Sequence, residues 1–156
     1  YRKSLLSNSN PYTPAVNLVF ALDEALKMMR EEGLNNIFFR HNKHKLAISN
    51  AVKALNLKLF ADEKYLSPSI TAVETEEIDA EEFRKTIKNN FDILLAGGQD
   101  HMKGKIFRIG HLGYVNDRDI ITVVSAISNT LLNFDKITTQ QAGEALVVAS
   151  RYLEET

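Results

Sequence analysis

Apolar residues recur at helical spacing in the first third of the chain. Between Ala15 and Glu32 they lie three or four residues apart, and most charged side chains fall on other faces; the apolar positions are Leu18, Leu22, Ala25, Leu26 and Met29. This spacing predicts one amphipathic helix that ends at Gly33. Thr13 is expected to be its N-cap, with Pro14 in the first turn, where a missing N–H costs nothing.

A second helix is predicted from about Leu34 to Leu55, with five apolar positions facing inward: Ile37, Phe38, Ile48, Val52 and Leu55. The order of helix, glycine and helix predicts an antiparallel or steeply crossed pair. Residues 1–14 are expected to form an irregular N-terminal segment, because Pro11 and Pro14 keep the backbone extended.

The remainder of the chain mixes alternating and helical patterns. Short strands are predicted at residues 57–60, 69–74 and 106–109, and a short apolar run lies at 93–96. Three further helices are predicted at 80–89, 117–131 and 139–153, the first of them capped by Asp79. The order ααββαββαα predicts an α+β fold, with residues 15–156 as one domain whose helices pack on one face of a small, mostly antiparallel sheet.

Composition narrows the classes of function. The 156 residues are 44% hydrophobic and 25% charged, as expected of one folded domain. A net charge of −1 supplies no basic surface, so no nucleic-acid partner is expected. The absence of cysteine excludes a disulfide scaffold, a cysteine-ligated metal site and a thiol nucleophile. No apolar run is long enough to span a membrane and the N-terminus lacks a signal-peptide profile, so no membrane span and a cytoplasmic location are expected.

Glycine is concentrated in one region. Residues 97–113 hold five of the seven glycines, in a spacing that matches neither of the common nucleotide-binding loops. One interpretation is turn chemistry around two short strands. The other is a backbone that approaches a ligand or a neighbouring chain closely. Both interpretations stay open at this point.

Arg108 is the main candidate for binding a ligand. It lies within the predicted strand 106–109, where alternation places Phe107 and Ile109 on the opposite face. An arginine at such a position can hold a carboxylate with two parallel hydrogen bonds. The alternative is an exposed or ion-paired arginine without a ligand.

The histidines give weaker signals. His41 and His44 lie three residues apart on the second helix, a spacing that suits a metal ion, but no carboxylate lies within a turn, so partly buried structural roles are favoured. His101 and His111 either line a pocket or lie in exposed loops. The residues alone therefore indicate one anion-binding arginine and no nucleophile, general base or metal site.

Six segments follow one another in an informative order: Pro11–Val16, Ala21–Leu26, Glu31–Leu34, Arg40–His41, Gly97–Gln99 and Lys103–Gly113. Together they resemble the C-terminal part of class V aminotransferases. The most similar branch contains the alanine–glyoxylate and serine–pyruvate aminotransferases, and includes sequences labelled as the small subunit of a soluble hydrogenase. The resemblance extends over nearly the whole chain.

The resemblance implies a pyridoxal 5'-phosphate enzyme of the aspartate aminotransferase fold, usually a homodimer, with its active site between a large and a small domain. This chain would be the small, C-terminal domain, and residues 1–14 would come from the inter-domain region. Its substrates would be a small amino acid, of the alanine or serine type, and a 2-oxo acid, of the glyoxylate or pyruvate type. Arg108 matches the arginine that binds the substrate carboxylate. Thr13 matches a threonine that contacts the cofactor phosphate of the neighbouring subunit, and Asn10 is a second candidate for that phosphate.

Three catalytic groups are missing from the matched segments. The Schiff-base lysine, the aspartate for the pyridinium nitrogen and the aromatic stacked on the ring would all belong to the large domain. Lys103 and Lys105 lie in a different segment from that lysine. The chain begins at Tyr1 and not at Met, and we expect it to be a domain of a longer enzyme that is inactive alone. The alternative is a non-catalytic α+β binding or dimerisation module that retains the small-domain fold.

Overall fold

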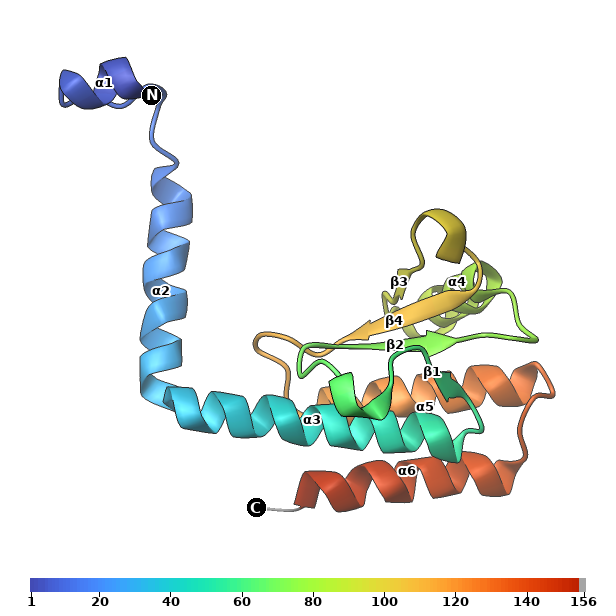
Figure 1. Cartoon of the computed structure of the whole chain (residues 1–156). Helices are drawn as coiled ribbons and strands as arrows, with labels where there is room; N and C mark the ends of the chain where they lie inside the picture. Colours follow the sequence, from blue (N-terminus) through green and yellow to red (C-terminus); the bar gives the residue numbers. More distant parts are fainter. Residues whose placement is uncertain (155–156) are drawn as a thin grey trace. The chain divides into compact units, whose positions relative to one another are not determined.

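The computed structural model describes residues 1–154, which fall into two compact units that meet between Phe38 and Phe39. The first unit contains α1 (Arg2–Leu6), α2 (Val16–Glu32) and the start of α3 (Leu34–Ala54). The second unit contains the rest of α3 and all the elements that follow it (Figure 1). Each unit is described by itself.

The second unit is an α+β fold, as predicted. Its antiparallel sheet has the strand order β1-β2-β4-β3, and Figure 1 shows α3, α5 and α6 running beneath it. The strands are β1 (Lys58–Leu59), β2 (Ile70–Glu74), β3 (Ala96–Gly97) and β4 (Ile106–Gly110). The helices are α4 (Ala80–Phe91), α5 (Asp117–Asn133) and α6 (Thr139–Glu154), with short 3₁₀ turns η1 (Glu63–Tyr65) and η2 (Asp100–Met102).

One hydrophobic core joins the sheet to its helices. Phe83 of α4 stacks on Phe107 of β4, with ring centroids 5.1 Å apart, and both side chains are fully buried. Burying two such aromatic rings stabilises the fold by several kcal/mol, about 1.5–3 for each side chain. The apolar stripes of α4 and α5 are buried and include Ile87, Ile120, Val123, Val124, Ile127 and Leu131.

The ends of two helices are closed by side chains. The carboxylate of Asp79 accepts hydrogen bonds from the backbone N–H groups of Glu81 and Glu82, which confirms the predicted cap. At α5 the cap is Asn116, whose side chain accepts from the N–H of Asp119 while the Asp119 carboxylate accepts from the N–H of Asn116. This reciprocal pair fixes the point at which the chain leaves the loop after β4 and enters α5.

The N-terminal segment differs from its prediction in two respects. Residues Arg2–Leu6 form a short helix in a region expected to be irregular. The predicted N-cap at Thr13 is wrong, because α2 begins at Val16 with Ala15 as the N-cap residue. The N–H of Val16 bonds to the carbonyl of Pro14 at 2.9 Å, so the chain turns once more after Pro14 before the helix starts.

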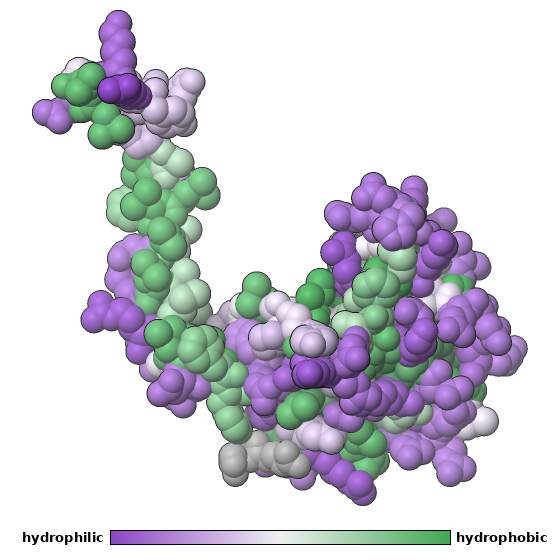
Figure 2. Space-filling model, in the orientation of Figure 1, coloured by the Kyte–Doolittle hydropathy of each residue, from purple (hydrophilic) through white to green (hydrophobic). Residues whose placement is uncertain are grey.

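Helix α2 has the predicted length but no buried residue. The side chains expected to face inward are open to solvent, with exposed fractions of 71% at Leu18, 57% at Leu22, 49% at Leu26 and 47% at Met29. Figure 2 shows hydrophobic residues along much of this helix. Its polar face is internally paired, since Lys27 contacts Asp23 at 2.8 Å and Glu24 at 3.7 Å. An amphipathic helix of this kind is normally stabilised by packing, so α2 presents a face that requires a partner.

Candidate carboxylate-binding site

Arg108 lies in the middle of β4, on the face of the sheet opposite the core. Its neighbours Phe107 and Ile109 are buried at 0% and 2% exposure, whereas Arg108 is half-buried, as the alternating pattern predicts. Its direct partners across the sheet are Ala72 on β2 and Ala96 on β3. Because alanine has the smallest side chain after glycine, both flanks of the arginine leave room above the sheet.

The guanidinium of Arg108 is held at one end. Its Nε donates a hydrogen bond to the carbonyl oxygen of Gly97 at 2.9 Å. Within residues 1–154, the terminal nitrogens of this side chain have no hydrogen bond or ion pair. The alternative of an ion-paired arginine therefore does not hold within this part of the chain. A planar guanidinium fixed through Nε and open at its two Nη atoms can bind a carboxylate with two parallel hydrogen bonds.

Of the two glycines next to this site, Gly98 is required by space, because the atom that blocks a side chain there belongs to the backbone. A Cβ on Gly98 would lie 2.0 Å from the backbone oxygen of Met102, so a side chain there forces the turn apart. A Cβ on Gly97 would lie 2.5 Å from Nη1 of Arg84. By contrast, Gly104 and Gly113 have φ of +76° and +94°, the left-handed backbone that favours glycine. The turn interpretation therefore holds at Gly104 and Gly113. The close approach at 97–98 is to the chain itself, so the interpretation of a ligand or a neighbouring chain stays a prediction.

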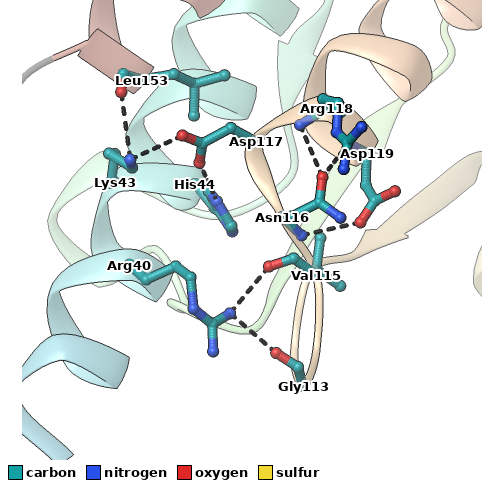
Figure 3. Close-up of polar contacts among 10 residues, drawn as sticks. All are labelled: Arg40, Lys43, His44, Gly113, Val115, Asn116, Asp117, Arg118, Asp119 and Leu153. Atoms are coloured by element: carbon teal, nitrogen blue, oxygen red, sulfur yellow. Dashed lines mark hydrogen bonds and ion pairs between the residues drawn. The ribbon is translucent and has the colours of Figure 1, made fainter. Parts of the chain in front are cut away.

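The loop that follows β4 is held by the N-terminal part of α3 (Figure 3). Nη1 of Arg40 donates to the carbonyl oxygens of Gly113 and Val115 at 2.9 and 3.0 Å. Nε2 of His41 accepts a hydrogen bond from the backbone N–H of Gly113 at 3.2 Å. The loop is thereby fixed just beyond the strand that contains Arg108.

A buried histidine joins a hydrogen-bonded network at the start of α5 (Figure 3). His44 is fully buried, and its Nε2 lies 2.8 Å from a carboxylate oxygen of Asp117, whose other oxygen lies 3.0 Å from Nζ of Lys43. Burial lowers the pKa of His44, although Asp117 acts in the opposite direction. Burial opposes ionisation of Asp117 too, yet the hydrogen bonds from His44 and Lys43 keep its pKa below the usual value.

Three of the four histidines are buried, and the fourth is exposed. His41 and His44 are buried, and the described residues contain no group of three His, Asp or Glu side chains that could hold a metal ion. His111 is also fully buried, with Nε2 3.0 Å from Oγ1 of Thr71. Burial, together with the nearby His44, lowers the pKa of His111 to about 4. His101 lies exposed in η2.

Thr13 and Asn10, the two candidates for a phosphate contact, lie in the exposed segment between α1 and α2. They belong to the first unit, whereas Arg108 belongs to the second. Within residues 1–154 neither side chain makes a hydrogen bond, so each has its polar group available. Among the same residues, no helix combines the length and apolar character needed to span a membrane.

Comparison with known proteins gives relatives named as aminotransferases and as soluble hydrogenase subunits, although no family model matches the chain. It is 50% identical over 153 residues to the soluble hydrogenase small subunit of a Synechococcus species, covering 98% of the chain and 40% of that protein. It is 38% identical over 122 residues to an uncharacterized aminotransferase of Methanocaldococcus jannaschii, covering 78% and 32%. The ureidoglycine–glyoxylate aminotransferase of Bacillus subtilis has a similar structure, with a TM-score of 0.82 and 31% identity over 90% of this chain and 37% of that one. The chain thus spans no more than about two fifths of these relatives.

Proposed function

Because this chain belongs to the class V aminotransferases, we propose that it supplies the substrate-carboxylate site of a pyridoxal-phosphate-dependent enzyme. That enzyme transfers an amino group between a small amino acid, of the alanine or serine type, and a 2-oxo acid, of the glyoxylate or pyruvate type. Relatives named for this kind of reaction include serine–glyoxylate aminotransferases of Methylorubrum extorquens and Arabidopsis thaliana, each 34% identical to the chain. Their names guide the choice of substrate class.

The geometry of Arg108 carries the proposal. Nε is occupied by the Gly97 carbonyl at 2.9 Å, the Nη atoms are open within residues 1–154, and the cross-strand neighbours of Arg108 are two alanines. An amino acid and its 2-oxo acid both have a carboxylate next to the reacting carbon, so one arginine can hold both in the same orientation. Holding the carboxylate at a fixed place leaves the neighbouring carbon in a defined position, which is the main contribution a binding residue makes to rate.

The described residues do not by themselves form a pyridoxal phosphate site. Lys103 and Lys105 are exposed in the turn before β4, whereas a Schiff-base lysine needs a desolvated pocket that lowers its pKa. The cofactor would carry the amino group between the two substrates. We assign to Thr13, and secondarily to Asn10, a contact with its phosphate in a neighbouring subunit, since both side chains have unused hydrogen-bonding groups.

The exposed apolar face of α2 supports the view that the chain works inside a larger assembly. We assign Leu18, Leu22, Leu26 and Met29 to an interface with the remaining part of the enzyme, which accounts for about three fifths of the relatives' length. The first two turns of α2 are apolar almost all round, with Asn17 as the one polar residue between Val16 and Leu22. A helix segment without a polar face is normally enclosed on all sides. This favours a homodimer, in which a second chain covers the side of the helix that the remaining part of the same enzyme leaves open.

A second function has one observation in its favour. The cyanobacterial relatives at 50% and 52% identity are named as subunits of a soluble hydrogenase. On that basis the chain would be a non-catalytic binding or dimerisation module. The chain has no cysteine and so offers no thiolate to a metal cluster of a hydrogenase. The open carboxylate-binding site at Arg108 is a separate observation, and it favours the aminotransferase.

The test uses the complete reading frame that contains this chain. After purification with pyridoxal phosphate, transfer from alanine or serine to glyoxylate or pyruvate is measured for the wild type and for Arg108→Ala. The proposal expects activity in the wild type and a strong rise of KM in the variant, since losing a bidentate carboxylate contact costs about 2–4 kcal/mol. A start codon directly before Tyr1, or unchanged kinetics in Arg108→Ala, would contradict it. The first outcome would favour the non-catalytic module.

A further inference from the structure

We propose that Arg84 of α4 is a positioning residue for Arg108. It holds the segment Leu95–Gly98, and the Gly97 carbonyl within that segment in turn orients the guanidinium that binds the substrate carboxylate. This inference rests on the proposed function, because the carboxylate site is the one described above. It assigns a role to a residue that never touches the substrate.

Arg84 connects α4 to the segment that precedes β3. Its Nε donates to the carbonyl oxygen of Leu95 at 2.7 Å, and its Nη1 lies 2.8 Å from both carboxylate oxygens of Glu81. The Arg84 side chain is 22% exposed, so this pair is only partly screened by water. Glu81 fixes the direction of the guanidinium, and the guanidinium fixes the backbone at Leu95.

The ion pair also packs directly on the main chain of Gly97. A Cβ added there would lie 2.5 Å from Nη1 of Arg84 and 2.6 Å from Oε1 of Glu81, so no space separates the pair from the strand. On the next residue, Gly98 meets the turn that contains Met102 just as closely. The segment is therefore held by α4 on one side and by η2 on the other.

Strand β3 needs this support. It is an edge strand of two residues, with only Ala96 and Gly97 in register with β4. A ladder this short holds a strand weakly, because few hydrogen bonds oppose its displacement. The Arg108 side chain depends on it nevertheless, since within residues 1–154 its one hydrogen bond is to the Gly97 carbonyl. A shift of the strand would turn the open end of the guanidinium away from its substrate.

The test compares Arg84→Gln with Lys85→Gln in the complete enzyme. Each variant removes one positive charge from α4, but Lys85 is exposed and makes no hydrogen bond or ion pair within residues 1–154. The readout is kcat/KM for an amino acid and for the matching amine that lacks the carboxylate. Arg84→Gln is expected to lower the value for the amino acid roughly 10- to 100-fold, through KM, and to leave the amine unchanged. Lys85→Gln is expected to change neither.

Arg108→Gln separates this inference from the proposed function. If Arg108→Gln does not reduce the preference for the amino acid over the amine, the proposed function itself fails. If Arg108→Gln removes that preference and Arg84→Gln does not, only the positioning role is overturned. An equal loss for both substrates in Arg84→Gln also overturns it. Should Arg84→Gln not fold, Arg84→Lys, which keeps a charge for Glu81, must show a smaller loss of the same selective kind.

A measurement without catalysis uses the 156-residue chain itself. The Nε–H proton of Arg108 can be observed by NMR, and its exchange with water reports the bond to Gly97. Slow exchange is expected in the wild type and in Lys85→Gln, and faster exchange in Arg84→Gln at an unchanged unfolding midpoint. Equal exchange rates in the three proteins would contradict the proposal.

Discussion

His44 and Asp117 lie 73 positions apart in the chain, and their side chains meet at 2.8 Å. The histidine is fully buried on α3, and the aspartate is the first residue of α5. The contact joins these two helices at the end of the sheet where the chain leaves β4. A buried imidazole placed this close to a half-exposed carboxylate gives the fold a polar connection at the margin of its core.

The strength of this connection can be measured by a double-mutant cycle. Asp117→Ala, His44→Phe and the double variant are unfolded with urea, and the coupling free energy is expected to be about 1 kcal/mol or more. The cycle removes the separate effect of losing an acidic residue at a helix N-terminus. A coupling free energy near zero would show that the two side chains are close without stabilising each other.

Acid is expected to destabilise the second unit through His111. Its pKa is lowered to about 4 in the folded state from the ordinary value of 6.5, so the unfolded chain binds a proton below pH 6.5 that the folded chain does not. The free energy of unfolding therefore falls as the pH decreases from 6.5 toward 4, by up to roughly 3 kcal/mol. Urea unfolding across this pH interval measures the slope.

The control for that slope is His111→Gln, which keeps a group able to bond with Thr71 but does not titrate. The slope of the variant should be distinctly smaller between pH 4 and 6.5. His44 adds to the slope with the same sign, because its pKa is also lowered. Identical slopes in the wild type and in His111→Gln would mean that this histidine is not the titrating group.

Gly98→Ala is expected to lower the free energy of unfolding by about 1–3 kcal/mol, as overpacking does elsewhere. The added methyl group would lie 2.0 Å from the Met102 backbone oxygen, and backbone cannot move aside as a flexible side chain can. Gly110→Ala is the matched comparison, since an added Cβ there has no atom within 4 Å. Thermal unfolding of both variants should separate them; similar losses would refute the steric explanation.

Arg108→Lys tests whether charge alone suffices at the carboxylate site. Lysine keeps the positive charge but has a single side-chain nitrogen. It cannot offer two parallel hydrogen bonds to a carboxylate and also bond to the Gly97 carbonyl, as the three nitrogens of arginine can. In the complete enzyme, kcat/KM for the amino acid should fall about 10-fold or more, with the free energy of unfolding little changed. Full activity in this variant would show that the planar group is not needed.

Leu22→Lys tests the interface assigned to α2. In the 156-residue chain the leucine is 57% exposed, so the free energy of unfolding should change little, by roughly 0.5 kcal/mol or less. In the complete enzyme the same charge would be buried. Gel filtration should then show either a smaller fraction of dimer or the appearance of aggregated protein. Glu31→Lys, on the polar side of the helix, serves as the control and should assemble normally.

Much of the second unit follows from local pattern. Alternation placed Phe107 and Ile109 in the core and Arg108 outside it, because side chains of a strand point to opposite faces in turn. Helical spacing identified the buried stripes of α4 and α5 for the same kind of reason. Such patterns depend only on neighbouring residues, and the sequence contains them completely.

Contacts between distant segments did not follow from pattern. The bond from Arg108 to Gly97 depends on the pairing of β3 with β4, and the pair of His44 with Asp117 depends on how α3 and α5 pack. The stripe of α2 was predicted correctly as a stripe, but its burial was not, since a pattern shows that a helix face is apolar and not which surface covers it. Thr13 was misplaced as a cap because the chain makes one more turn after Pro14.

The Arg108 side chain is oriented by a main-chain carbonyl oxygen, a group that every residue of a protein has. Binding of the substrate carboxylate is therefore independent of the residues that recognise the rest of the substrate. Under the proposed function, a protein engineer who wants a different amino acid as donor can leave β3 and β4 as they are. The substitutions would be concentrated among the pocket residues contributed by the rest of the enzyme. The two half-reactions would keep the same carboxylate contact.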